Sequence, residues 1–184
     1  FTTLNSTVYY SNLGVVAFPA TIEDNSFDIE DQSGEIITAT KQYRKNLLIF
    51  KKSTTYSYTG SLPIRQLSTR YGVHNDNCIQ EINGLLYGVG PKGIFVSNGV
   101  SVKSIGAPLL EYYQDLKFGF VADGSTVQSI FTGQWENKFL IYIGDITTVE
   151  TVSDILLIYD TVGESWEVFS GWTDPTVLRS LNRF

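Results

Sequence analysis

The sequence Gly88-Val89-Gly90-Pro91-Lys92-Gly93 matches the G-x-G-x-x-G pattern of dinucleotide-binding loops. In those loops a strand leads into a helix, and the N-terminus of that helix holds the pyrophosphate. Here Pro91 interrupts the loop, and a second strand-like run, Ile94–Ser97, follows it. The context therefore predicts a glycine-rich hairpin turn, and we expect no bound cofactor.

Acidic residues with the spacing of a calcium loop occur between residues 24 and 35. Positions 1, 3, 5, 7 and 12 of such a loop are matched by Asp24, Ser26, Asp28, Glu30 and Glu35. Ile29 stands where the loop needs glycine for its tight turn, and the pattern predicts no flanking helices. The spacing therefore favours a solvated acidic loop over a metal site.

Nucleophilic and metal-binding side chains are scarce. His74 is the only histidine and Cys78 the only cysteine, so a histidine metal cluster and an intramolecular disulfide are both excluded. No G-x-S-x-G nucleophile motif is present, and we expect a loop histidine and a small core cysteine. Paired carboxylates from distant parts of the chain stay open as a glycosidase alternative. On balance we expect a protein without enzymatic activity.

Composition and charge narrow the class of protein further. Hydrophobic residues make up 42% of the 184 residues and charged residues 17%, which indicates a globular chain. The longest apolar stretches, such as Phe139–Ile143, are far too short for a membrane-spanning helix. A net charge of −6 without a basic run argues against tight, sequence-independent DNA binding.

Short apolar runs separated by turn residues predict strands in three similar units. Asn83-Gly84 is the strongest hairpin signal, because both residues accept positive φ in a type I′ turn. Each unit contains at least three predicted strands. The predicted strands of the first unit are Ile36–Thr40, Asn46–Phe50 and Thr55–Thr59. Those of the second are Cys78–Ile82, Leu85–Val89 and Ile94–Ser97, with Val100–Ile105 as a candidate fourth, outer strand. Those of the third are Val127–Trp135, Lys138–Ile143, Ile155–Tyr159 and Trp166–Phe169.

The second strands of the three units align, with Leu48, Leu86 and Leu140 as the corresponding blade positions. Repeats of roughly 40 to 50 residues with several strands each are typical of propeller blades. We therefore predict an all-β fold of antiparallel meander blades that belong to a complete or an incomplete β-propeller; a β-sandwich or another β fold is the alternative. One short connector helix is expected over Ala107–Leu116.

The domain organisation follows from these repeats. Residues 36–184 are expected to form the blades, and residues 1–35 a partial blade or an irregular N-terminal segment, all within one domain. The sequence contains no methionine. We therefore expect a chain that begins inside a longer gene product or that has been processed.

Tyr159-Asp160, followed by Gly163 and Trp166, resembles the end of a kelch blade. In that family an aspartate begins the turn between two outer strands, and the tryptophan packs between blades. The resemblance implies a structural role for Trp166. The aspartate-box turn of sialidases is also similar, but here the spacing from aspartate to glycine is one residue longer.

From Ser6 to Ile105 the order of segments is similar to that of the β-propeller in tail hub or nozzle proteins of short-tailed bacteriophages. The similarity extends more faintly through Asp160–Phe169. The segments that carry it are Thr7–Asn12, Ile36–Ala39, Asn46–Tyr56, Tyr71-Gly72, Asn83–Tyr87, Gly93–Gly99 and Val102–Ile105.

This resemblance implies a structural protein of the virion, made in the host cytoplasm and located in the phage tail. It implies a homo-oligomeric ring at the head-to-tail junction that contacts the portal or an adaptor and other tail proteins. DNA would pass through the ring without tight binding, and the acidic balance agrees with that role. The family offers no catalytic residues to transfer. A carbohydrate-binding or carbohydrate-cleaving propeller, such as an adhesin or depolymerase, and a kelch-type interaction module are the alternatives.

Overall fold

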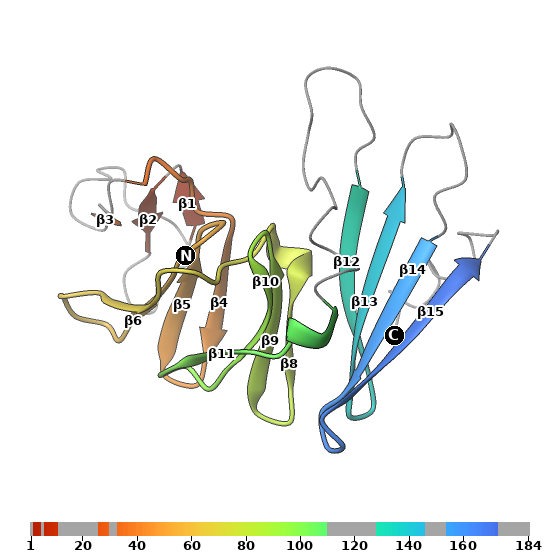
Figure 1. Cartoon of the computed structure of the whole chain (residues 1–184). Helices are drawn as coiled ribbons and strands as arrows, with labels where there is room; N and C mark the ends of the chain where they lie inside the picture. Colours follow the sequence, from red (N-terminus) through yellow and green to blue (C-terminus); the bar gives the residue numbers. More distant parts are fainter. Residues whose placement is uncertain are drawn as a thin grey trace.

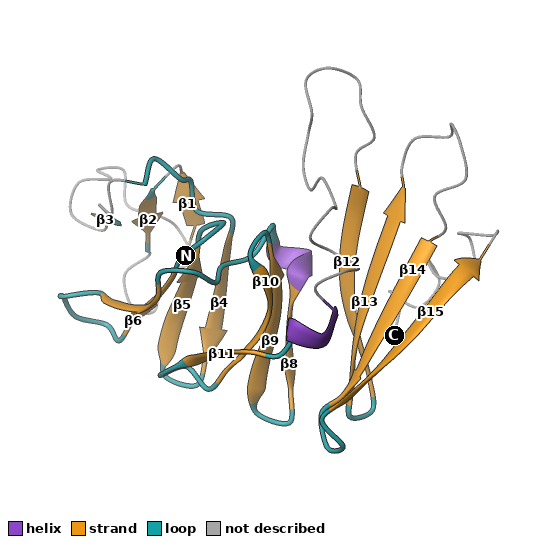
Figure 2. Cartoon of the chain, in the orientation of Figure 1, coloured by secondary structure: helices purple, strands orange, loops and turns teal. Residues whose placement is uncertain are grey.

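The computed structural model describes residues 2–4, 6–10, 26–29, 33–109, 128–145 and 154–172, and within these ranges the fold is all β (Figure 2). The strands form four antiparallel sheets, which we number from the N-terminus. The described helical elements are two short 3-10 helices, η2 (Asp76–Cys78) and η3 (Ala107–Leu109). The prediction of an all-β fold made of antiparallel meanders is confirmed.

The first sheet is small and lies in the N-terminal segment. It consists of β1 (Thr2–Leu4), β2 (Thr7–Tyr9) and β3 (Ser26–Asp28), paired in that order. Val8 pairs with Phe27, and both pack toward the second sheet.

The second, third and fourth sheets each contain four strands that pair in sequence order. Each is therefore a complete meander. The strands of the second sheet are β4 (Ala39–Tyr43), β5 (Asn46–Phe50), β6 (Thr55–Tyr58) and β7 (Arg65–Ser68). Those of the third are β8 (Ile79–Ile82), β9 (Leu85–Gly90), β10 (Gly93–Ser97) and β11 (Val102–Ser104). Those of the fourth are β12 (Gln128–Trp135), β13 (Lys138–Asp145), β14 (Asp154–Asp160) and β15 (Ser165–Trp172).

The sheets stack face to face in chain order, and across the described ranges they form an open stack (Figure 1). One apolar cluster joins the first and second sheets, and a larger one runs through the second, third and fourth. The middle strands are apolar on both faces because each inner sheet is covered on both sides. In β5, for example, Leu47 and Ile49 belong to the first cluster, and Leu48 and Phe50 to the second.

Turn chemistry sets the register of the first hairpin in each four-stranded sheet. Arg44, Asn83 and Glu136 occupy the same turn position and all have positive φ, at 56°, 51° and 51°. The predicted Asn83-Gly84 hairpin is confirmed, with Ile82 paired to Leu85. The turn therefore places β5, β9 and β13 as the second strand of their sheets.

Several element boundaries differ from the predictions, and two of these differences change the description of the fold. The first strand of the second sheet is Ala39–Tyr43, three residues later than expected, because its pairing starts from the turn at Tyr43–Asn46. The expected connector helix begins as η3 at Ala107–Leu109, and residues 110–116 lie outside the described ranges. Within those ranges no helix has the length and apolar character needed to cross a membrane.

Candidate functional site

The G-x-G-x-x-G sequence forms a hairpin between two strands. Gly88 and Gly90 belong to β9, Gly93 begins β10, and Gly90 pairs with Gly93 across the two-residue turn. A Cβ at Gly88 would overlap the Phe95 ring, and a Cβ at Gly90 would overlap the Gly72 carbonyl oxygen. The glycines therefore allow close packing, and the hairpin prediction is confirmed.

The described members of the acidic pattern make structural hydrogen bonds. The Asp28 carboxylate accepts a hydrogen bond from Thr7 Oγ1 within the first sheet. Glu35 Oε2 accepts hydrogen bonds from Ser53 N and Ser53 Oγ, at 3.0 and 2.9 Å. Asp24 and Glu30 lie outside the described residues. In the part of the chain that the structure describes, no group of three or more His, Cys, Asp and Glu could hold a metal ion.

The turn that begins at Asp160 joins the two outer strands of the fourth sheet. Asp160 Oδ1 accepts hydrogen bonds from Val162 N and Gly163 N, both at 2.9 Å, and these donors lower the pKa of the carboxyl. Trp166 is the second residue of the return strand β15. Its ring centroid is 4.8 Å from that of Tyr159, and its Nε1 donates to Ile105 O at 2.9 Å. Trp166 thereby bridges the fourth sheet and the end of the third.

His74 and Cys78 both lie where the chain crosses from the second sheet into the third. Burial and the charge of Lys52 lower the pKa of His74 from 6.5 to about 4, so the imidazole is neutral at physiological pH. Burial raises the pKa of Cys78 to about 11, so its thiol stays protonated and is a poor nucleophile. Cys78 Sγ lies 3.9 Å from Ile130 O, in the contact between the third and fourth sheets.

The predicted blade positions, Leu48, Leu86 and Leu140, all lie on the second strand of their sheets, but they are not at the same distance from the preceding turn. Leu48 and Leu140 are each the third residue after their turn, a place that Tyr87 takes in the third sheet. Leu86 is one residue earlier and matches Leu47. Because neighbouring strand residues point to opposite faces, Leu86 faces the preceding sheet, whereas Leu48 faces the following one.

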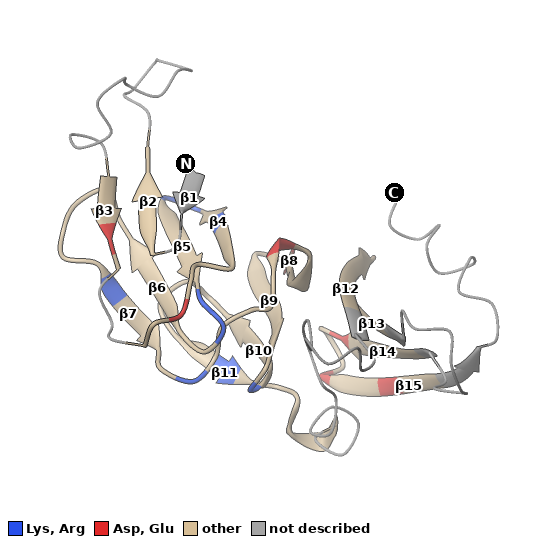
Figure 3. Cartoon of the chain, turned by 90° about the horizontal axis from the view of Figure 1, so that it is seen from above, with Lys and Arg blue, Asp and Glu red and all other residues tan. Residues whose placement is uncertain are grey.

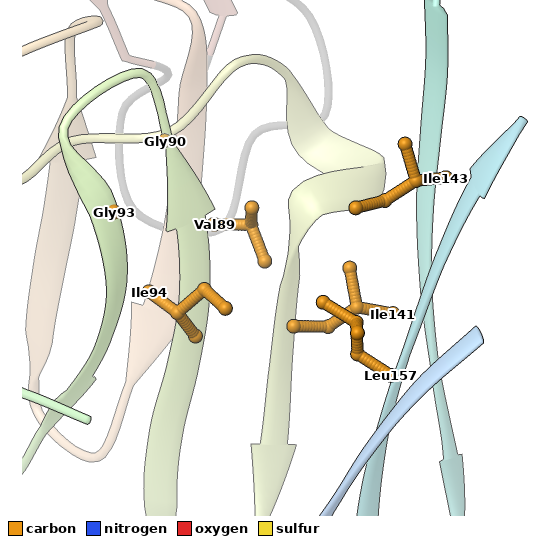
Figure 4. Close-up of a pocket in the computed structure, with 7 residues that line it drawn as sticks. All are labelled: Val89, Gly90, Gly93, Ile94, Ile141, Ile143 and Leu157. Atoms are coloured by element: carbon orange, nitrogen blue, oxygen red, sulfur yellow. The ribbon is translucent and has the colours of Figure 1, made fainter. Parts of the chain in front are cut away.

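A small cavity lies between the third and fourth sheets (Figure 4). Its volume is about 10 Å³, barely enough for one water molecule. The lining is entirely apolar, so the cavity offers no partner to a polar ligand. It is formed by Val89, Gly90, Gly93, Ile94, Ile141, Ile143 and Leu157.

The hairpin turns at one end of the stack are connected by hydrogen bonds, a feature that the sequence did not reveal. Tyr43 Oη donates to Gly84 O across the second and third sheets. Asn83 Nδ2 donates to Asn137 Oδ1 at 3.1 Å and to Thr161 Oγ1 at 3.2 Å in the fourth. These contacts join residues up to 78 positions apart. They link turns of the second, third and fourth sheets at this end of the stack, which we call the turn end.

Charged residues of both signs are scattered over the described sheets (Figure 3). The described salt bridge, Lys138 Nζ to Glu167 Oε1 at 3.6 Å, lies on the fourth sheet.

Neither a protein-family model nor a curated protein sequence matches this chain.

Proposed function

We propose that this chain is a structural protein of a phage tail and that it contributes its stacked sheets to a hub or nozzle at the head-to-tail junction. The observation that carries the proposal is the serial face-to-face stack of four antiparallel sheets. The order of its segments from Ser6 to Ile105 resembles that of tail hub or nozzle propellers.

Hydrogen-bonded polar residues at the turn end support the proposal that this protein acts by binding neighbouring proteins in an assembly. The turn end presents Asn83, Asn137 and Thr161 in fixed positions, because each is hydrogen-bonded to a turn of another strand pair. A rigid polar surface of this kind suits contacts with neighbouring proteins. On this proposal several copies form a ring around the DNA channel, between the portal or adaptor and the other tail proteins.

Imaging the particles of the virus that encodes this chain tests the proposal directly. We expect density for the chain as a cyclic ring around the channel at the head-to-tail junction. An epitope-tagged copy should also co-purify with the tail complex. Finding the polypeptide only outside particles would refute the proposal.

A DNA-binding measurement tests the role as a conduit. With a net charge of −6, the protein should leave duplex DNA unshifted in a gel assay at physiological salt, because too few cations are available to displace phosphate counterions. A stable complex under these conditions would contradict a conduit that lets DNA pass.

The second candidate is carbohydrate binding, which Trp135 favours. Its side chain is 57% exposed, and exposed aromatic rings can stack on apolar faces of other molecules. Lys138 Nζ lies 5.9 Å from the centre of that ring, so one face is already near a cation. Binding on a glycan array that is lost in Trp135→Ala would favour this candidate over the structural role.

A further inference from the structure

The chain contains two Asn-Gly pairs, and each lies in a turn between strands of the third sheet. Asn83-Gly84 joins β8 to β9, and Asn98-Gly99 lies between β10 and β11. The two glycines have similar backbone conformations, with φ of 72° and 81°, and both asparagine side chains are exposed. Because glycine follows each asparagine, any difference in reactivity between the pairs must come from their surroundings.

Asparagine followed by glycine can lose ammonia without an enzyme. The glycine nitrogen gives its proton to water or hydroxide and attacks the side-chain Cγ; a C–N bond forms, Nδ2 takes up a proton, and ammonia leaves. Water then opens the five-membered imide at either carbonyl carbon and gives aspartate or isoaspartate. The nitrogen must approach Cγ to within about 3 to 3.5 Å, so the rate depends on how freely the backbone of the pair can move. Glycine moves most freely because it has no Cβ.

The surroundings of Asn98-Gly99 oppose this attack. Gly99 N, the attacking atom, donates to Ser97 Oγ at 3.1 Å. Asn98 Oδ1 accepts hydrogen bonds from two backbone N–H groups of the same turn, both at 2.9 Å. Gly99 is buried so closely against the Tyr43 ring that an added Cβ would lie 2.7 Å from it. Rotation of the Gly99 backbone toward Cγ would therefore break these bonds and displace a ring that is 1% exposed.

Asn83-Gly84 lies in open surroundings by comparison. Gly84 is exposed, and a Cβ added to it would meet no atom within 4 Å. The described hydrogen bonds to Gly84 reach its carbonyl oxygen, to which Tyr43 Oη and Arg44 Nη2 donate. These bonds do not involve the attacking nitrogen, so rotation of the Asn83 backbone can bring that nitrogen toward Cγ. The hydrogen bonds of the exposed Asn83 amide exchange with water and restrain it only weakly.

Loss of the Asn83 amide would remove a bridge between the third and fourth sheets. Asn83 Nδ2 donates to Asn137 Oδ1 and Thr161 Oγ1, and a carboxylate has no hydrogen to donate. Thr161 Oγ1 already donates its own hydrogen to Asn137 O at 2.7 Å. Isoaspartate would in addition lengthen the backbone of a two-residue turn by one carbon, and the length of the turn sets the pairing of the hairpin.

We propose that Asn83 is a site of spontaneous deamidation, that Asn98 is protected from it by its surroundings, and that conversion of Asn83 loosens the contact between the third and fourth sheets. The turn end then changes with the age of the molecule, because the reaction needs only water. This inference concerns the chemistry of one turn and is independent of the proposed function.

Peptide mapping by mass spectrometry measures both sites in one sample of the unaltered chain, incubated in mildly alkaline buffer. We expect Asn83 to convert at least about tenfold faster than Asn98, because the hydrogen bonds and packing of the second pair must break before the attack. Free peptides of residues 80–87 and 95–102 are the reference and should convert at similar rates. Equal or slower conversion at Asn83 in the folded chain would overturn the proposal, and so would an Asn83 that stays intact while its peptide converts.

Ser97→Ala tests the cause of the protection. It removes the acceptor of the Gly99 N–H group, so conversion at Asn98 should become about threefold faster or more, with the rate at Asn83 unchanged. The matched control is Ser104→Ala, at an exposed serine of the neighbouring strand β11, which should change neither rate. A rate at Asn98 that Ser97→Ala leaves unchanged would refute this account of its protection.

Thermal unfolding of the converted protein tests the consequence. Ion exchange separates it from the intact protein by its added negative charge, and its unfolding midpoint should be lower than that of the intact form. Asn83→Gly is the matched control: it accepts the backbone conformation of the turn but has no amide to lose, so incubation should leave its midpoint unchanged. Equal midpoints for the intact and converted forms would show that conversion does not loosen the contact between the sheets.

Discussion

The third sheet is buried on its two sides by interfaces of different construction. On one side it meets the second sheet through side chains such as Phe50 and Phe95, whose rings lie 6.4 Å apart, and also through the crossing segment, Tyr71–His74, which runs between the sheets. Val73 N donates to Lys51 O at 3.1 Å, and His74 N donates to Val89 O at 3.3 Å. Backbone therefore touches backbone, and Gly90 lies so close to Gly72 that no side chain fits between them.

On the other side the third sheet meets the fourth through side chains. The Tyr87 and Phe139 rings lie 5.5 Å apart, and Gln80 bonds to Thr132. The small apolar cavity also lies in this interface. Side-chain packing can adjust to a change of volume, whereas a backbone contact cannot. At the crossing segment the first interface should therefore tolerate added atoms far less than the second interface does.

Gly90→Ala should produce the largest effect. The added methyl group would overlap the Gly72 carbonyl oxygen, and backbone on both sides of the contact would have to shift. We expect a loss of at least about 3 kcal/mol in the free energy of unfolding, at the upper end of overpacking costs. Urea denaturation monitored by tryptophan fluorescence measures it.

Gly133→Ala is the matched control, because it adds the same methyl group in a strand where the nearest atom, Leu140 Cβ, would lie at an ordinary contact distance of 3.9 Å. Its effect should stay within about 1 kcal/mol, since alanine costs a strand less backbone entropy than glycine does. Equal losses for the two variants would remove the contrast between the interfaces.

Trp166→Ala tests the side-chain interface. The substitution removes packing against Tyr159 and the hydrogen bond to Ile105 O. Because Trp166 is half-buried, we expect a loss of about 2 to 3 kcal/mol, at or below the lower end for buried aromatic residues. The exposed Trp135, changed to alanine, should cost less than about 1 kcal/mol. An unchanged midpoint for Trp166→Ala would show that this ring does not hold the two sheets together.

Short stretches of sequence were enough to predict the strands that carry their own apolar pattern and turn residues. The second strands were identified because they are apolar on both faces, and Asn83-Gly84 fixed one hairpin. β7 was missed because Arg65–Ser68 has one large apolar residue, and its pairing with β6 depends on the neighbouring strand. The apolar pair Ile36-Ile37 suggested a strand, but Ile37 packs between sheets and Ile36 is exposed.

Contacts between sheets could not be predicted in the same way. The glycine pattern was correctly assigned to a hairpin, yet the reason for Gly90 is a carbonyl oxygen 18 residues earlier in the chain. Likewise Asn83 was identified as a turn residue, whereas its bond to Thr161 depends on how two sheets stack. Such pairs leave no periodic signal in one sequence, because their partners are far apart along the chain.

Acid should weaken the interface between the second and third sheets through His74. Its pKa is about 4 in the folded protein against 6.5 for an exposed histidine, so the unfolded chain binds more protons between these values. This contribution to stability is complete above about pH 6.5 and decreases as the pH falls toward 4. In His74→Gln the decrease in unfolding free energy between pH 6.5 and 4.5 should be smaller than in the unaltered protein. Parallel curves would mean that His74 takes no part in this pH dependence.

Substitutions of Asn83 should have small effects, and they separate two contributions to the stability of the turn end. Asn83→Ala removes the bonds to Asn137 and Thr161 and also places alanine at a φ of 51°, which alanine adopts at a cost. Asn83→Gly removes the same bonds but accepts that backbone conformation. Because the side chain is exposed, we expect a loss of about 0.5 kcal/mol for glycine, at the low end for a hydrogen bond, and about 1.5 kcal/mol for alanine once the backbone cost is added. Thermal unfolding of both variants measures the difference. Equal losses would show that backbone conformation contributes little here, and no loss with glycine would show that the bonds between the third and fourth sheets leave stability unchanged.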